Sequence, residues 1–357
     1  MGLLEKPAQR PPDELRSVGS GAFGLPVHFL QKALAHEDPY SLHVDESICD
    51  DRRCVDGIGR SVLMAVLAAA GCGDSSKADP PIVGERAPCG WLDTPAGTVD
   101  VSERSDLFHD GVFSRVEARF LEAPYPSFHG VALEEGSCRY LELDYGDCDP
   151  ACVGGEVCTA EGVCAAFPAG VAAGRLTVDG LGSPVSIVAE DFDPGLYLGP
   201  AGLPAPLFEA TDVIGARLSG GDVPRMTLDA AGVAQMDADL VNSGLTLVDG
   251  GDVEIAWTAG PDPDACIQMV LNGSNLVHGA PLRDIVWCEG PDSGSLVVPQ
   301  AMVERFPHGD TPEVSEGYDH PPSILGRYTR SRAETEMGPV ELLVRSTTYF
   351  LVSHPEL

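Results

Sequence analysis

Hydrophobic and polar residues alternate along much of the chain in short runs. In residues 112–122, Val112, Val116, Ala118 and Phe120 share one face, and Arg115, Glu117 and Arg119 lie on the other. A period of two with this polarity predicts a β-strand with one buried face. Residues 138–145 form a second run of this kind. We expect both strands to belong to a small β domain, residues 89–147.

The same alternation continues from residue 165 to the C-terminus. Val253, Ile255 and Trp257 share one face of residues 252–258, and Met269 lies on the apolar face of residues 266–271 between Ile267 and Leu271. The pattern predicts further strands at residues 174–179, 184–189, 213–218, 225–229, 244–248, 284–288, 295–298, 339–346 and 348–353.

These strands are short and are separated by turn residues about every 8–12 positions, which is typical of an all-β fold. We predict an antiparallel β-sandwich for residues 165–357, with Trp257 in its core and a sugar-stacking role for Trp257 as the alternative. Gly250-Gly251 lies between two of the runs and predicts a hairpin. Residues 299–306 alone predict a helix, because Pro299 suits a first helical turn.

An apolar segment near the N-terminus has the composition of an export signal. It occupies residues 61–70, follows Arg60 and ends in small residues just before Cys72. A run of about ten residues is too short to cross a bilayer, which takes about 20. We interpret residues 55–71 as a signal peptide, with a buried Ala-rich helix as the alternative.

The residues around Cys72 resemble the lipobox of bacterial lipoproteins, although Ala69 stands where that family more often has Leu. The resemblance implies that Cys72 is acylated and begins the mature chain. Residues 72–88 would then be the lipidated cysteine and a flexible tether. Residues 1–54 precede the signal and are interpreted as a disordered extension that arises from a start site placed too far upstream.

The cysteine count agrees with an exported chain. The sequence has 11 cysteines, of which two precede Cys72 and eight follow it. An even number in an oxidising compartment predicts four disulfides. The economical pairs outside the central cluster are Cys89–Cys138 and Cys266–Cys288, and each would stabilise the fold by about 3–4 kcal/mol in the chain-entropy model.

The other four cysteines, Cys148, Cys152, Cys158 and Cys164, form a compact cluster with the spacing C-x3-C-x5-C-x5-C. Residues 148–164 are too few to bury a core, so we expect a small module that its bridges hold together. By analogy with small knotted modules we favour the interleaved pairing of Cys148 with Cys158 and Cys152 with Cys164. Four cysteines allow three connectivities, and a zinc site is the alternative.

Acidic residues dominate the charge. Asp and Glu number 55 against 22 Lys and Arg, so the formal net charge is −33. Charge of this sign argues against nucleic-acid binding, which needs Lys and Arg to replace the counterions of phosphates. The acidic residues are scattered, which indicates a solvated surface.

The search for catalytic or metal-binding motifs finds no convincing site. Asp292-Ser293-Gly294-Ser295 has some likeness to the nucleophile segment of trypsin-like proteases, but its flanking residues differ, and we interpret it as a turn that leads into the strand at 295–298. The six histidines after Cys72 lie in separate segments without ligand spacing and are predicted to be surface residues: His109, His129, His278, His308, His320 and His354.

Several loops carry paired carboxylates that could bind Ca²⁺, although none has the spacing of an EF-hand loop. They are Asp144/Asp147/Asp149, Asp191/Asp193, Asp237/Asp239 and Asp262/Asp264. We therefore assign no cofactor, with Ca²⁺ as a possible ligand, and no catalytic residue.

Together, these features are similar to the surface lipoproteins of predatory myxobacteria. The likeness rests on the lipobox, Gly136-Ser137-Cys138, the cysteine cluster and the runs Ala256-Trp-Thr258, Ile285-Val-Trp-Cys-Glu289 and Asp292-Ser-Gly-Ser295. The resemblance implies an envelope location, at the outer membrane or cell surface, and a β-rich architecture, but no activity.

We therefore expect a lipid-anchored, non-enzymatic binding or structural module with an unknown protein or glycan ligand. A carbohydrate- or protein-binding adhesin is a sharper form of this expectation, with a platform drawn from Trp91, Trp257, Trp287 and Tyr197. An extracytoplasmic hydrolase is the alternative.

Overall fold

The structure of the chain is a computed structural model that describes residues 80–105, 111–144, 148–237, 240, 244–273, 283–309 and 323–355. These residues form one large sheet, one smaller sheet and three two-stranded ladders. Helical structure among them is limited to α3 (Gln300–Val303) and to Leu240. The predicted all-β class is therefore confirmed. The predicted extension, signal peptide and acylated Cys72 lie outside the described residues.

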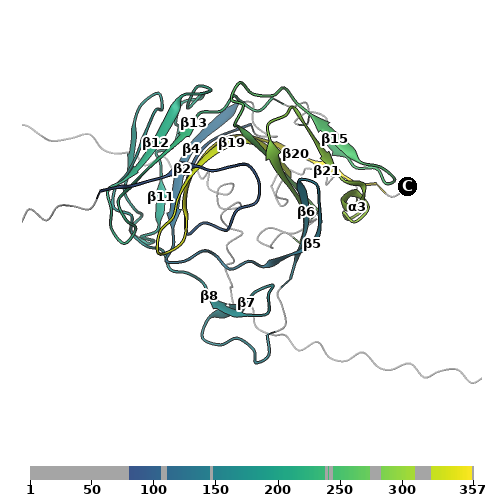
Figure 1. The fold of residues 1–357 in the computed structure, drawn as a ribbon, viewed down its shortest axis with the longest axis horizontal. Helices are drawn as coiled ribbons and strands as arrows, with labels where there is room; N and C mark the ends of the chain where they lie inside the picture. Colours follow the sequence, from purple (N-terminus) through teal and green to yellow (C-terminus); the bar gives the residue numbers. More distant parts are fainter. Residues whose placement is uncertain are drawn as a thin grey trace, which may run out of the picture.

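The large sheet is strongly curved and forms an arch (Figure 1). Its neighbouring strands are antiparallel except for β20 and β3, which run parallel. In spatial order it consists of β11 (Leu196–Leu198), β4 (Val112–Phe120), β3 (Gly97–Ser105), β20 (Val340–Phe350), β19 (Ser323–Ala333), β16 (Cys266–Asn272), β17 (Asp284–Pro291), β6 (Cys138–Leu143) and β5 (His129–Glu135), with β2 (Glu85–Arg86) paired to β19.

The smaller sheets lie on the convex side of this arch or beside it. The five-stranded sheet has the order β1 (Ile82–Val83), β13 (Met226–Ala231), β12 (Val213–Leu218), β9 (Leu176–Asp179) and β10 (Val185–Ile187). The two-stranded ladders are β14 (Leu245–Thr246) with β21 (Val352–Ser353), β15 (Val253–Ala256) with β18 (Ser295–Val298), and β7 (Glu156–Cys158) with β8 (Cys164–Ala166).

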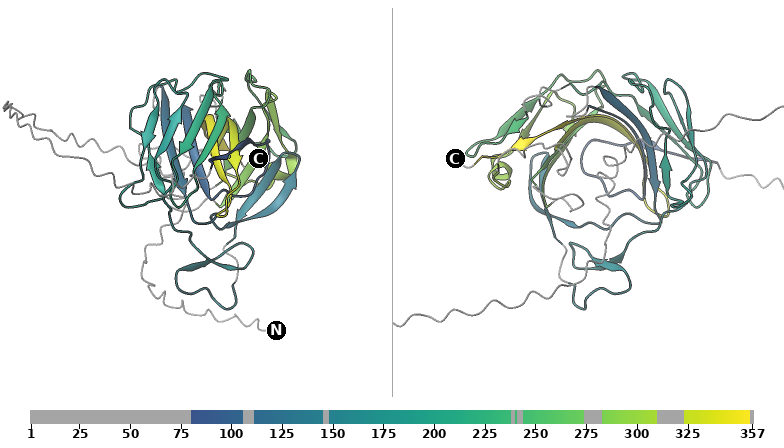
Figure 2. Two further views of the ribbon diagram at one scale, coloured as in Figure 1. Left: turned by 60° about the vertical axis from the view of Figure 1, so that its left-hand side comes forward. Right: turned by 180° about the vertical axis from the view of Figure 1, so that it is seen from behind.

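One hydrophobic core fills the space between the five-stranded sheet and one end of the arch. Val99, Val116 and Leu342 of the large sheet are fully buried there against Leu176 and Ile214 of the smaller one. Full burial of an aliphatic side chain of this size contributes about 1.5–3 kcal/mol. This pair of layers is a sandwich, but it differs from the predicted one, because one layer includes β3 and β4 from outside residues 165–357. Figure 2 shows the five-stranded sheet covering the outer face of the arch.

A second core covers the other end of the same convex face. Met269 of β16 and Leu325 of β19, which are paired in register, pack with Ile255 of β15, Val298 of β18 and Met302 of α3. The expected inward face of residues 252–258 is confirmed, since Val253 and Trp257 pack against this core with Ile255. The predicted helix at 299–306 is confirmed only over about one turn, where α3 covers residues 300–303.

The predicted division into separate β domains is wrong. Strands β3, β4, β5 and β6 from residues 89–147 enter the same sheet as four strands from residues 266–350. Two long-range ladders join these two parts of the chain into one sheet, β3 with β20 and β6 with β17. Alternation along the sequence identifies strands but contains no information about their partners.

The predicted tether is also too long. Ile82–Val83 pairs with β13, and Glu85–Arg86 pairs with β19. The last part of residues 72–88 is thus built into both main sheets. The predicted hairpin at Gly250-Gly251 is wrong as well, because the strands on its two sides pair elsewhere, β14 with β21 and β15 with β18.

All eight cysteines after Cys72 form disulfides, but the two long-range pairs differ from the economical ones. Cys89 bonds Cys266, and Cys138 bonds Cys288. Cys138 and Cys288 lie directly opposite each other on β6 and β17, with their Cα atoms 4.0 Å apart. These bridges close loops of 177 and 150 residues, which corresponds to about 5 kcal/mol each in the chain-entropy model.

The interleaved pairing in the small module is confirmed. Cys148 bonds Cys158 and Cys152 bonds Cys164, so the zinc alternative is excluded for these cysteines. Only the short ladder of β7 and β8 gives the module regular structure. It projects away from the arch (Figure 1).

Candidate functional site

The concave face of the arch is lined with charged side chains at the end formed by β4, β3 and β20. On these strands the positions that alternate with the buried Val99, Val116 and Val344 carry Asp100, Glu117 and other polar residues. Opposite parity places these residues on the inner face, away from the five-stranded sheet. The sequence pattern identifies them only as the polar side of each strand.

Four of these residues form what we call the charged quartet, Asp100, Arg115, Glu117 and Arg345. Arg345 Nε donates to Asp100 Oδ1 over 3.1 Å, and its Nη2 contacts the other oxygen of the same carboxylate. Arg115 pairs with Glu117. The side chains are 17%, 37%, 10% and 27% exposed respectively, so the quartet is partly withdrawn from water yet remains accessible.

The two carboxylates of the quartet oppose each other across the β3–β4 ladder, since Asp100 and Glu117 are register partners. Burial raises the pKa of Glu117; Arg115 opposes this shift, and the negative charge of Asp100 adds to it. Like charges in directly opposed positions destabilise a sheet. Ionisable groups with shifted pKa values cluster at functional sites, so the quartet is a candidate site.

An aromatic and cationic group lies farther along the same strands. The guanidinium of Arg104 is 5.8 Å from the ring centroid of Phe113 on β4 and 5.7 Å from that of Tyr349 on β20. Both distances lie within the range of cation–π interactions. The concave face therefore offers aromatic surface as well as hydrogen-bonding groups.

The other end of the concave face is covered by the segment that follows β2. Arg330 of β19 donates from Nη2 to the carbonyls of Pro88 at 2.7 Å and Gly90 at 2.6 Å. Trp91 packs edge-on against Trp287 with ring centroids 5.4 Å apart. The Cys89–Cys266 disulfide fastens the same segment to β16, so this end of the arch is filled by the protein itself.

Glu289 is buried beneath this segment. Its carboxylate accepts a hydrogen bond from the Tyr328 hydroxyl and lies 3.3 Å from Arg330 Nη2. Burial raises the pKa of Glu289 to about 7, against the opposing effect of Arg330. Because Arg330 also donates to the carbonyls of Pro88 and Gly90, the Glu289–Arg330 pair helps to hold the covering segment on the sheet.

The predicted aromatic platform is only partly assembled. Trp91 and Trp287 come together as described, and Arg139 stacks on Trp91 at 4.4 Å. Tyr197 is not part of a platform, because it is fully buried and its hydroxyl donates to the carbonyl of Gly174. Trp257 is mainly a core residue, as predicted, and its indole N–H donates to Asp292 over 2.6 Å.

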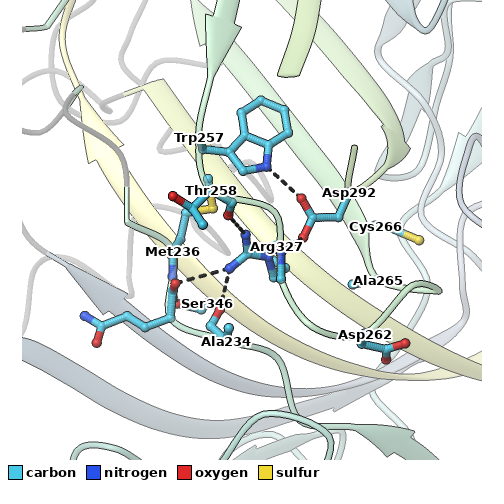
Figure 3. A network of polar contacts seen from close by, with 12 residues as sticks. Ala234, Met236, Trp257, Thr258, Asp262, Ala265, Cys266, Asp292, Arg327 and Ser346 are labelled. Atoms are coloured by element: carbon cyan, nitrogen blue, oxygen red, sulfur yellow. Dashed lines mark hydrogen bonds and ion pairs between the residues drawn. The ribbon is translucent and has the colours of Figure 1, made fainter. Parts of the chain in front are cut away.

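Asp292 belongs to a structural network rather than to a catalytic one (Figure 3). Its carboxylate accepts from Trp257, from Gly260 N and from Arg327 Nε, the last over 2.6 Å. The remaining guanidinium nitrogens of Arg327 donate to the carbonyls of Ala234, Gln235 and Thr258. Arg327 is 2% exposed and fully partnered, so it ties three connections to the convex face of β19.

The rest of the Asp-Ser-Gly-Ser motif forms the predicted turn into β18. Ser293 Oγ donates to the carbonyl of Ser295, and Gly294 has a φ of +91°, a conformation that favours glycine. Ser293 is thus engaged within its own turn, and both ring nitrogens of His354 contact other groups, the carbonyl of Phe306 and the carboxylate of Asp249.

The paired-carboxylate loops have several protein partners. Asp262 and Asp264 both contact Arg86, at 2.9 and 3.3 Å, and Asp193 contacts Arg119 at 3.1 Å. Asp147 and Asp239 lie outside the described residues. These contacts offer a structural reason for the carboxylates that does not need Ca²⁺.

The structure instead brings together three residues that can act as metal ligands and that are far apart in the sequence, Asp249, His308 and His354. The prediction of a surface position is wrong for His354, which is 1% exposed. His109, His278 and His320 lie outside the described residues. No local sequence pattern predicts this cluster, because its members are separated by at least 46 positions and come into contact only in the folded chain.

No protein-family model and no curated protein matches the chain. Within the described ranges, no helix has the length and apolar character needed to cross a membrane.

Proposed function

We propose that the protein is exported, anchored to the cell envelope through acylated Cys72, and acts there as a non-enzymatic binding protein. The four disulfides support export, because such bonds persist in oxidising compartments. The resemblance of residues 61–72 to a lipobox supports the anchor.

The ligand-binding surface in this proposal is the concave face at β4, β3 and β20. The observation that carries it is the charged quartet, in which two carboxylates are directly opposed on neighbouring strands and each is paired with an arginine. A sheet that served only as a scaffold would gain stability from uncharged residues at these positions.

The chemistry of the face favours a neutral, polyhydroxylated ligand, such as a glycan. The quartet contains two positive and two negative side chains and therefore offers donors and acceptors without net charge. Phe113 and Tyr349 supply aromatic surface beside it. A nucleic acid or other polyanion would need an excess of positive charge, which neither the quartet nor the chain has.

A glycan array combined with thermal unfolding tests the proposal. The protein from residue 73 onward is screened with and without Ca²⁺, and a true ligand should raise the unfolding midpoint by mass action. The double variant Asp100→Asn/Arg345→Gln should lose that rise. A ligand that raises the midpoints of both proteins equally would bind elsewhere and overturn the assignment of the concave face.

A further inference from the structure

Asp249, His308 and His354 meet at one corner of the second core. Asp249 lies in the turn after β14, His308 follows α3 and His354 follows β21. Backbone pairing brings them together: the parallel ladder of β14 and β21 places Leu245 beside Val352, and Gly309 exchanges hydrogen bonds with His354 over 2.8 and 3.0 Å. The positions of the three side chains are therefore set by regular backbone contacts.

The Asp249 carboxylate lies close to one nitrogen of each imidazole. His354 Nε2 is 3.1 Å from Asp249 Oδ1, and His308 Nε2 is 3.6 Å from Asp249 Oδ2. The two imidazole rings stack with centroids 4.0 Å apart. One ligand atom from each residue lies within 4.8 Å of the others. Ligands of a tetrahedral Zn²⁺ at about 2.0–2.1 Å would be roughly 3.3 Å apart. Because the rings are stacked, the partly exposed His308 ring would have to rotate to direct a nitrogen at the same ion as His354.

Both ring nitrogens of His354 face hydrogen-bond acceptors. Its Nδ1 is 2.9 Å from the carbonyl of Phe306, which can only accept, so Nδ1 carries a proton. Its Nε2 then faces a second acceptor, the Asp249 carboxylate. Either Nε2 carries a second proton, or its lone pair binds a cation that the carboxylate shares.

Several features favour the cation. An imidazole that donates its other N–H to a backbone carbonyl is the arrangement by which proteins orient a metal-ligating histidine. His308 presents a second imidazole nitrogen to the same carboxylate, and one Asp249 side chain can neutralise only one imidazolium. Two imidazoles and one carboxylate form a donor set for transition metals rather than for Ca²⁺ or Mg²⁺, which prefer oxygen ligands.

We propose that Asp249, His308 and His354 form a binding site for a divalent transition metal of the zinc class. The metal would join the turn after β14, the segment after α3 and the C-terminal segment, and so would fasten the end of the chain to the second core. Three protein ligands leave a coordination position for water. The site lies on the convex side, apart from the charged quartet.

The test uses the full disulfide-bonded protein after treatment with a chelator. Calorimetric titration with Zn²⁺ should give one binding event per chain, and Zn²⁺ should raise the thermal midpoint, whereas Ca²⁺ and Mg²⁺ at the same concentration should not. Bound Co²⁺ should show the visible absorption of a site with nitrogen ligands. His308→Gln and Asp249→Asn should each weaken Zn²⁺ binding at least about tenfold.

Two controls make the result decisive. His129→Gln changes a histidine of β5, outside the cluster, and should leave Zn²⁺ binding unchanged. His308 is 36% exposed, so its replacement should preserve the fold, which the circular dichroism spectrum checks. Absence of a stoichiometric Zn²⁺ event in the wild type, or equal Zn²⁺ affinity in His308→Gln and the wild type, would overturn the proposal in favour of a protonated His354 paired with Asp249.

Discussion

Asp100 and Glu117 occupy directly opposed positions on β3 and β4, and each carboxylate is paired with an arginine, Arg345 and Arg115 respectively. Two like charges in this relationship reduce the stability of the sheet unless the arginines remain in place. The concave face therefore carries a local cost within an otherwise well-packed fold. A binding role for this face would account for the cost.

The first prediction concerns the stability of this quartet. Arg345→Gln removes the cation beside Asp100 and should lower the free energy of unfolding by about 1–2 kcal/mol, because both carboxylates are then left to repel each other. Adding Asp100→Asn removes the repulsion and should restore most of the loss. Urea denaturation measures both values; a single variant as stable as the wild type would show that the pairing contributes nothing.

The second prediction concerns pH. Burial raises the pKa of Glu289 to about 7 in the folded protein, from an ordinary value of 4.5. The folded state therefore binds more protons than the unfolded state between these values, and stability should fall as pH rises from about 4.5 to about 7. Glu289→Gln, which imitates the protonated form, should flatten this part of the curve and gain up to about 3 kcal/mol relative to the wild type at pH 8.

Urea denaturation across pH 4–8 checks this expectation. Glu254→Gln, at an exposed position of β15, is the matched control and should keep the wild-type slope. An unchanged slope in Glu289→Gln would show that the burial of this carboxyl does not govern the pH dependence.

The third prediction concerns the long-range disulfides. Removing Cys138–Cys288 by a double Ala substitution opens a loop of 150 residues and should cost about 5 kcal/mol, whereas removing Cys148–Cys158 opens a loop of only 10 residues and should cost about 3 kcal/mol. The second change should also leave the arch intact, since the module lies outside both cores. Non-reducing peptide mapping should recover Cys89–Cys266; peptides joining Cys89 to Cys138 would contradict the strand order.

The fourth prediction concerns the anchor. Labelled palmitate should enter the wild-type protein in a bacterial host that processes lipoproteins and should not enter Cys72→Ala. Cys49→Ala is the matched control and should be labelled normally, because the proposal places this residue in a segment that is removed with the signal. Deleting residues 1–54 should leave labelling and export unchanged. Label in Cys72→Ala would place the lipid on another residue.

Most of the strands could be predicted from the sequence, because alternation reports directly which face of a strand is buried. The prediction of Ile267, Met269 and Leu271 on one face of β16 is confirmed. Of the longest strand pair, the pattern predicts β20 but not β19. In β19, Arg327, Thr329 and Ser331 are buried polar residues that interrupt the apolar pattern. Their partners come from distant segments, and no local pattern reveals them.

The pairing of strands and the sites could not be predicted in the same way. Cys138 bonds Cys288 because β6 lies beside β17, a neighbour relation that short-range spacing does not encode. In the sequence, Asp100 and Glu117 have the pattern of ordinary solvated charges. Only the pairing of β3 with β4 places them opposite each other on the concave face. His308 and His354 likewise become neighbours only through the bridge at Gly309.

The most direct test of the central claim is the dissociation constant of the best glycan from the array, measured by calorimetry for three proteins. Arg217→Gln is the matched control, since Arg217 is a half-exposed arginine on β12 that contacts Asp179 and Asp229 on the five-stranded sheet. The concave-face account predicts that Arg217→Gln binds like the wild type and that Asp100→Asn/Arg345→Gln binds at least about tenfold more weakly, a difference of about 1.4 kcal/mol. Equal dissociation constants for the wild type and the double variant would contradict it.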